Sequence, residues 1–238
     1  MDPVDKWFPA IGFRDMSYLL LILTVVLSFG FVAITKPKKM LGLRLLLAFS
    51  GAFLLALTIF DLLPEVYDSS DPRAMGVFIM AGILIQIFLE FFSKGAEHGH
   101  MHWDEQKEVF PWVLFISLSI HAFMEGLPLT DANPILYGIL VHKIPIALIL
   151  SAFLLNSQKN KITAFVFIFL FSLMTPFGSL LATHLEFLIH YKAQITAVVI
   201  GILLHISTVI LFESSQGHTF NLRKLIVIFL GIVMAYFI

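Results

Sequence analysis

The sequence predicts an all-α polytopic membrane protein with eight transmembrane helices. Of its 238 residues, 59% are hydrophobic and only 13% are charged, and the mean hydropathy is +0.94. A soluble domain typically carries about 25% charged residues. The charges recur at intervals close to the ~20 residues that a helix needs to cross the hydrocarbon core. The apolar segments lack the period-two alternation of a transmembrane barrel, so we expect helices.

Each expected span is apolar between its polar ends. The second and third spans enclose only Asp61 and Glu90, the seventh only His205, and the fourth and fifth two ionisable residues each. The spans lie at about 15–36, 44–65, 73–94, 108–131, 131–159, 161–184, 192–213 and 221–238. We expect them to form a single domain over residues 1–238, with a cytoplasmic loop at about 94–108 that contains histidines.

Lysine and arginine are distributed unevenly over the connecting segments. Of the fifteen, ten fall in the odd-numbered loops and four in the N-terminal segment and the even-numbered loops. Because cytoplasmic loops carry an excess of basic residues, both termini are expected outside the cytoplasm. The first residues lack the basic region of a cleavable signal, so the first apolar segment is expected to remain as a span. Compactness and the missing targeting sequence favour the inner membrane of a bacterium.

The composition also excludes several kinds of chemistry. The chain has no cysteine, which rules out disulfides, thiolate metal sites and cysteine nucleophiles. The net charge of −1 shows no bias toward nucleic acid as a partner. The lipid bilayer is the partner that the composition requires.

Two pairs of ionisable residues within the fourth and fifth spans are the candidate functional core. His121 and Glu125 are four positions apart, so they project from one face of a helix on successive turns. His142 and Lys143 follow in the next span, just before Pro145, which removes an amide donor. Charged groups at membrane depth are expensive and are usually functional. Two imidazoles and a carboxylate suit a divalent metal ion, although such residues can also only lock helices together.

These residues resemble the signatures of the ZIP family of divalent metal-ion transporters. The run from His121 to Gly126 is similar to the family's His-Asn-x-x-(Asp/Glu)-Gly, and the run from His142 to Ala147 to its His-Glu-x-Pro-His-Glu. The run from Asp61 to Glu65 resembles His-Leu-x-Pro-Glu, with aspartate in the histidine position. The run from Pro176 to Gly178 resembles the Pro-Gly break that the family has in its sixth helix. Residues 98–102 resemble the family's His-rich cytoplasmic segment after the third helix.

The resemblance implies a fold, a cargo and a set of ligands. It implies a 3+2+3 arrangement with the fourth and fifth helices central, a homodimer, and transport of zinc, or of iron or manganese, into the cytoplasm by alternating access. The cargo is the metal itself, and no prosthetic group is expected. The transport ligands would be Asp61, His121, Glu125 and His142. Ala122, Lys143, Ile146 and Thr175 stand in the positions for a second ion, so we expect a single-metal site.

Several other polar residues have open roles. Lys143 is interpreted as a counter-ion in place of the second metal, or as a side chain that reaches toward a headgroup. Glu65 is expected at the entrance. The three histidines of the cytoplasmic loop, His98, His100 and His102, could bind metal loosely. Gln86 and Glu90 could line an exit path or only pair helices, and His205 could be a relay ligand or a packing residue.

Two alternative functions remain open at this point. One is an intramembrane metal-dependent hydrolase, in which a bound metal activates water. The sequence lacks a His-Glu-x-x-His helix and a serine nucleophile motif, so we do not expect an enzyme. The other is a metal-sensing or proton-conducting membrane protein, which would show proton current without metal movement.

Overall fold

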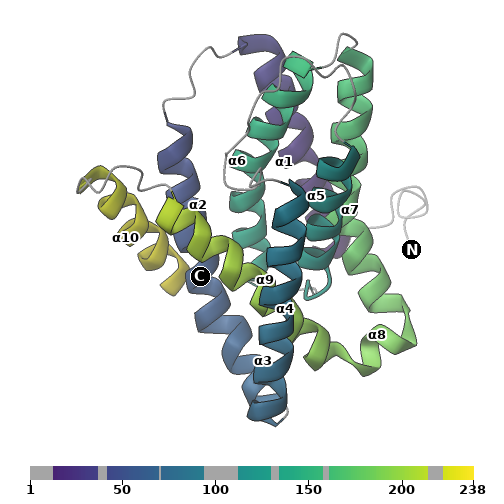
Figure 1. Ribbon diagram of the computed structural model, residues 1–238, viewed down its shortest axis with the longest axis vertical. Helices are drawn as coiled ribbons and strands as arrows, with labels where there is room; N and C mark the ends of the chain where they lie inside the picture. Colours follow the sequence, from purple (N-terminus) through teal and green to yellow (C-terminus); the bar gives the residue numbers. More distant parts are fainter. Residues whose placement is uncertain are drawn as a thin grey trace, which may run out of the picture.

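The computed structural model describes residues 13–36, 42–69, 71–93, 112–129, 134–157, 161–213 and 222–238, and these residues form helices and no strand (Figure 1). The helices are α1 (Phe13–Thr35), α2 (Leu43–Leu57), η2 (Thr58–Leu62), α3 (Leu63–Ser69), α4 (Pro72–Ser93), α5 (Trp112–Gly126), α6 (Ile135–Ser157), α7 (Lys161–His184), α8 (Glu186–His190), α9 (Lys192–Glu213) and α10 (Leu222–Tyr236). The expected all-helical architecture is therefore confirmed.

Six helical segments are long and apolar enough to cross a membrane. They lie at Met16–Thr35, Leu43–Asp68, Pro72–Phe92, Ile135–Asn156, Lys161–His184 and Lys192–Phe212. The other two expected spans correspond to α5 and α10, which have 15 residues each. At 1.5 Å per residue, such a helix is about 22 Å long, shorter than the ~30 Å hydrocarbon core. The chain is an integral membrane protein, and the count of eight spans stays a prediction.

The second expected span is continuous but changes its hydrogen bonding midway. Between α2 and α3 lies η2, a π-helical turn in which the amide of Leu63 donates to the carbonyl of Thr58. Pro64 follows at once and has no amide hydrogen, so the regular α-helical ladder is interrupted at this point. Such π-turns within α-helices are frequent at functional sites. Asp61 lies in this turn.

The break expected at Pro176 to Gly178 is absent, and Pro145 also lies within a continuous helix. Pro145 lies inside α6 and Pro176 inside α7, and both helices continue on either side. Each proline costs its helix one hydrogen bond without ending it, because neighbouring helices support the backbone. The expected Pro-Gly break of the sixth span is therefore a local loss of one donor rather than a gap.

The helices pack as two groups. One group contains α1, α5, α6 and α7, and the other contains α2, α4, α9 and α10. The groups meet chiefly where α2 contacts α6 and where α4 contacts α5. Figure 1 shows α10 against α2 on one side of the molecule and α1 and α7 on the other. Both α5 and α6 contact helices from the first three and from the last three expected spans.

The closest backbone contact in the second group is between α4 and α9. A Cβ atom at Gly82 would lie 1.9 Å from the carbonyl oxygen of Val198, and one at Gly201 would lie 2.0 Å from that of Ile79. Only glycine allows this approach, which is the usual way in which transmembrane helices gain packing area. The two helices are thereby fixed to each other near their midpoints.

Candidate metal centre

The ionisable residues of the fourth and fifth spans lie together between α5 and α6. Exposed fractions are 2% for His121, 1% for Glu125, 0% for His142 and 2% for Lys143. Each residue comes from an otherwise apolar helix, so the burial of charge here carries a high cost in free energy. The structure thus places four ionisable side chains in one buried cluster.

The two histidines and the glutamate are neighbours. His121 and Glu125 are on successive turns of α5, and Nε2 of His121 lies 3.6 Å from Oε2 of Glu125. The rings of His121 and His142 are 6.3 Å apart between centroids and nearly perpendicular, at 85°. The His121 imidazole thus lies beside the carboxylate, and the His142 imidazole lies against the His121 ring from another helix. This is a nitrogen and oxygen donor set of the kind that borderline divalent metals prefer.

The other oxygen of Glu125 is held by two donors. The Nζ atom of Lys143 forms a buried ion pair with Oε1 of Glu125. Thr175 of α7 places its Oγ1 3.0 Å from the same oxygen and 2.6 Å from the carbonyl oxygen of Ala122. The Lys143 ammonium also lies 5.3 Å from the centroid of the Phe171 ring, a cation–π contact. The cluster therefore contains a fixed cation beside the carboxylate.

A glycine contact brings α7 close enough to take part. A Cβ atom at Gly126 would lie 2.1 Å from the carbonyl oxygen of Thr175, and one at Gly178 would lie 2.1 Å from that of Phe123. Gly126 is the last residue of α5 and directly follows Glu125. The contact fixes Thr175 beside the carboxylate. The roles of Thr175 and Phe171 were not predicted, although their spacing of four residues places them on one face of α7.

Comparison with known proteins decides the family. The family model described as ZIP zinc transporter matches residues 93–238, which include α5 and α6. The chain belongs to the ZIP zinc transporter family. A curated relative, the protein zntD of Dictyostelium discoideum, is 33% identical over 106 residues. That match covers 37% of this chain and 16% of the length of the relative.

Asp61, the fourth expected ligand of this ZIP protein, lies apart from the other three. Leu47 of α2 shares an apolar cluster with Ile149 of α6, whereas Leu54 and Leu57 face Gly138, so the two helices are antiparallel. Asp61 thus lies one turn beyond Gly138 in the direction away from His142. Asp61 and His142 are therefore about 11 Å, or two helical turns, apart along the helix axes.

The described residues contain no group of three or more His, Asp or Glu side chains arranged to hold a metal ion. In this structure Lys143 pairs with Glu125, and Asp61 is half-buried in its π-turn. Glu65 is exposed and lies 3.7 Å from Nζ of Lys192, and both side chains are more than half exposed. His98, His100 and His102 lie outside the described residues.

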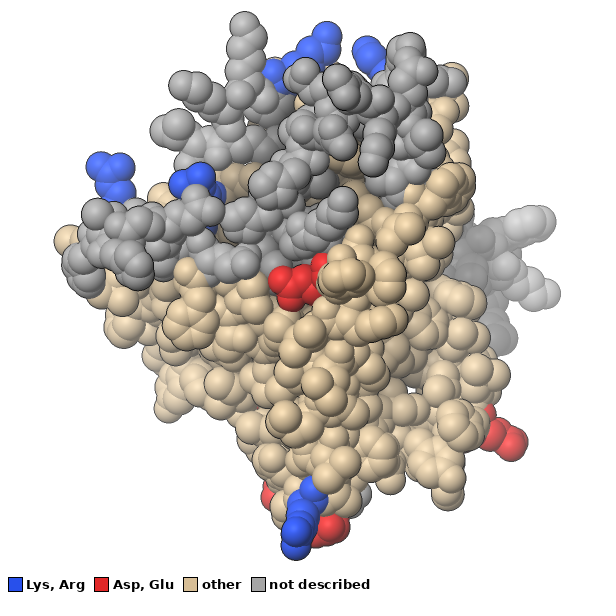
Figure 2. Space-filling model, viewed as in Figure 1, with Lys and Arg blue, Asp and Glu red and all other residues tan. Residues whose placement is uncertain are grey.

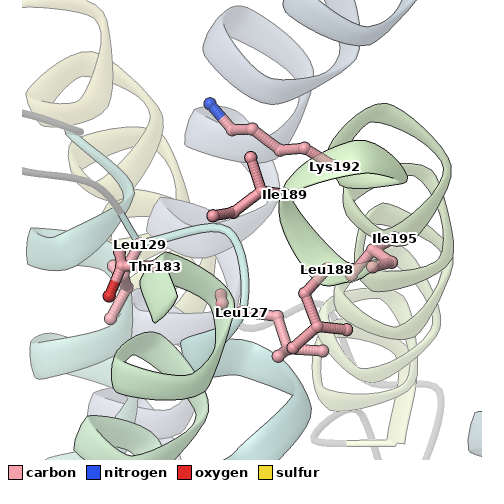
Figure 3. Close-up of a pocket in the computed structure, with 8 residues that line it drawn as sticks. Leu127, Leu129, Thr183, Leu188, Ile189, Lys192 and Ile195 are labelled. Atoms are coloured by element: carbon pink, nitrogen blue, oxygen red, sulfur yellow. The ribbon is translucent and has the colours of Figure 1, made fainter. Parts of the chain in front are cut away.

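A pocket of about 190 Å³ lies beyond the α5 end of the cluster (Figure 3). It is lined by Leu127, Leu129, Ala182, Thr183, Leu188, Ile189, Lys192 and Ile195. Leu127 and Leu129 belong to the turn that follows Glu125, and both are buried. The walls are mostly apolar, with Lys192 at one side. An apolar turn therefore separates the pocket from the ionisable cluster.

Proposed function

We propose that this ZIP protein carries a divalent metal cation, zinc in the first place, across the membrane into the cytoplasm. The observation that carries the proposal is the buried cluster of His121, Glu125 and His142 on two central helices. A buried cluster of this kind is costly unless it binds or conducts a polar species. Family membership supports the same class of cargo.

The donor set favours metals of the zinc type. Two imidazole nitrogens and a carboxylate, completed by Asp61 or by water, suit tetrahedral Zn²⁺, and with added water they suit Fe²⁺ or Mn²⁺. The chain has no cysteine, so no soft thiolate site competes for the ion. Because the relative affinities follow the Irving–Williams order, zinc should bind more tightly than iron or manganese.

Lys143 is proposed as the counter-ion of Glu125 when no metal is bound. Its ammonium pairs with Glu125, which leaves the cluster without an unpaired buried charge. An arriving dication would take over the carboxylate and displace the ammonium toward Phe171, over whose ring it already lies. The position of a second ion is thus filled by a side chain, which supports transport of one metal at a time.

Alternating access fits the apolar layers on both sides of the cluster. On one side lie Leu127 and Leu129, which belong to the large apolar core, and on the other a smaller cluster contains Leu47, Ile149 and Ile206. The side chains named in both layers are apolar. Movement of the two helix groups past each other would open one layer at a time and would bring Asp61 into reach of the cluster.

The orientation is proposed from the basic residues. Lys36 follows α1, Arg44 lies in the first turn of α2, Lys161 begins α7, and Arg223 lies in the first turn of α10. On the face shown in Figure 2, most Lys and Arg atoms lie toward the top of the view, and acidic atoms accompany the basic ones at the bottom. The positive-inside rule then places both termini outside the cytoplasm and Asp61 and Glu65 on the outer side.

The remaining features of the proposal follow the sequence. We propose one domain over residues 1–238, a homodimer, and a location in the inner membrane of a bacterium. The loop with His98, His100 and His102 would lie in the cytoplasm, where it could receive metal.

Uptake into proteoliposomes tests the function. Zn²⁺, Fe²⁺, Mn²⁺ and Cd²⁺ are offered to vesicles containing the intact protein or the double variant His121→Ala, Glu125→Ala. A matched control replaces His184 and Glu186, which are exposed, by alanine. We expect saturable uptake by the intact protein and the control, and none by the double variant. Absence of uptake of any of the four ions by folded protein would contradict the proposal.

A further inference from the structure

A second polar pair lies between α4 and α9, well separated in sequence from the metal centre. Nε2 of His205 is 2.6 Å from Oε2 of Glu90. The side chains are 16% and 24% exposed, so both are largely enclosed by the helices. The two residues are 115 positions apart in the chain, and the pair forms only because α4 packs along α9.

Gln86 lies one turn before Glu90 on α4 and is fully enclosed. Its exposed fraction is 0%, and neither its Nε2 nor its Oε1 atom has a hydrogen-bond partner among the described residues. A buried amide without partners destabilises the fold, and native proteins rarely keep one unless it serves another purpose. Gly82, which contacts α9, is followed by Gln86 four positions later and by Glu90 eight positions later. The amide is therefore on the face of α4 that carries Glu90 toward His205.

The cluster of Gln86, Glu90 and His205 begins near the level of the metal centre. It extends along the helix axes toward the loop between α4 and α5. Ser117 of α5 donates to the carbonyl oxygen of Leu89, at 2.7 Å. Ser117 is one turn before His121, and α5 runs in the direction opposite to α4. Gln86 is therefore near the level of His121, and Glu90 is about one turn nearer to the loop.

We propose that Gln86, Glu90 and His205 form a second binding station for the divalent cation, between the metal centre and the cytoplasm. The station rests on the proposed transport function. An imidazole nitrogen, a carboxylate oxygen and an amide oxygen make a mixed donor set that borderline and hard divalent metals accept, with water completing the shell. The ion would replace the hydrogen bond between Glu90 and His205, since Nε2 and Oε2 become its ligands. The amide oxygen of Gln86 would then gain the partner that it lacks.

The first test separates a functional amide from a structural one. Gln86→Met keeps the size of the side chain and removes both polar atoms. We expect its thermal stability to match or exceed that of the intact protein, because no hydrogen bond is lost. Its maximal uptake rate should fall at least about tenfold, because the cation loses its contact with the amide oxygen. The energy of one such polar contact to a charged group corresponds to about this factor. Lower stability with unchanged uptake would overturn the proposal.

The second test detects the station directly with Co²⁺, whose visible absorption reports nitrogen and oxygen ligands. The protein carries His121→Ala and Glu125→Ala, which remove the metal centre, and alanine at His98, His100 and His102. We expect one bound Co²⁺ per chain, lost on adding His205→Leu. Absence of Co²⁺ binding, or binding that survives His205→Leu, contradicts the station.

A control variant and the uptake assay keep the two proposals distinguishable. Thr208→Ala is one turn from His205 on α9, and its Oγ1 bonds only to carbonyl oxygens of its own helix, at 2.7 Å to Leu204 and 2.9 Å to His205. It should leave uptake unchanged. No uptake by the intact protein refutes the transport function, whereas normal uptake by both the intact protein and Gln86→Met refutes only the station.

Discussion

The ion pair between Lys143 and Glu125 yields the sharpest quantitative prediction. In Lys143→Met the methylene stem keeps its packing against Phe171, but Glu125 loses the buried ammonium beside its carboxylate. Removing one partner of a buried pair costs roughly 3–5 kcal/mol. Thr175 still donates to the carboxylate, so we expect the lower end of that range, about 3 kcal/mol, in the absence of metal.

The same change should strengthen metal binding. In the intact protein a dication must break the ion pair before it can use Glu125, whereas in Lys143→Met this cost is absent. If about 1.4–2.8 kcal/mol of the pair energy opposes binding, zinc should bind 10- to 100-fold more tightly. Added zinc should therefore raise the melting temperature of the variant more than that of the intact protein.

The assay is thermal unfolding in detergent with and without zinc, beside a titration of zinc affinity. Lys192→Met is the matched control, because Lys192 pairs with Glu65 at the surface and such pairs contribute only ~0–1 kcal/mol. We expect a small effect on stability and none on affinity in the control. Equal stability and equal zinc affinity in Lys143→Met and the intact protein would refute the assignment of Lys143 as a counter-ion.

Three further substitutions test other parts of the account. Gly178→Ala should abolish uptake, since its Cβ atom would meet the carbonyl oxygen of Phe123 at 2.1 Å, while Gly76→Ala, with nothing within 4 Å, should transport normally in the same vesicle assay. Thr175→Val leaves the Glu125 carboxylate with one donor fewer and should lower stability by about 1–3 kcal/mol, as measured by thermal unfolding. Glu65→Gln should raise the half-saturation concentration for zinc about two- to threefold at low ionic strength only, because salt screens exposed charges.

The class of the protein and the proximity of His121 to Glu125 could be predicted from the sequence. Apolar segments of about 20 residues have few structural solutions in a bilayer. The four-residue spacing of His121 and Glu125 defines a helix face without any tertiary information. The family signatures implied that His142 lies near this face, and its ring is 6.3 Å from that of His121. Lys143, which departs from the signature, reaches the same face through its ion pair with Glu125.

Other features depend on tertiary contacts that no local pattern encodes. The pair of Glu90 and His205 joins residues 115 positions apart, and its existence follows from the glycine contact of α4 with α9. The separation of Asp61 from His142 depends on the register between α2 and α6. The continuity of α6 through Pro145 was not predicted, because support from neighbouring helices is invisible in a single segment.

X-ray absorption at the zinc K edge of the loaded protein tests the central claim most directly, since it reports the atoms around the ion. The account predicts a shell of two imidazole nitrogens with carboxylate or water oxygens, reduced to one imidazole in both His121→Ala and His142→Ala. The loop variant in which His98, His100 and His102 are alanine should retain the full shell. A shell that stays unchanged in His121→Ala and His142→Ala would place the zinc elsewhere and contradict the account.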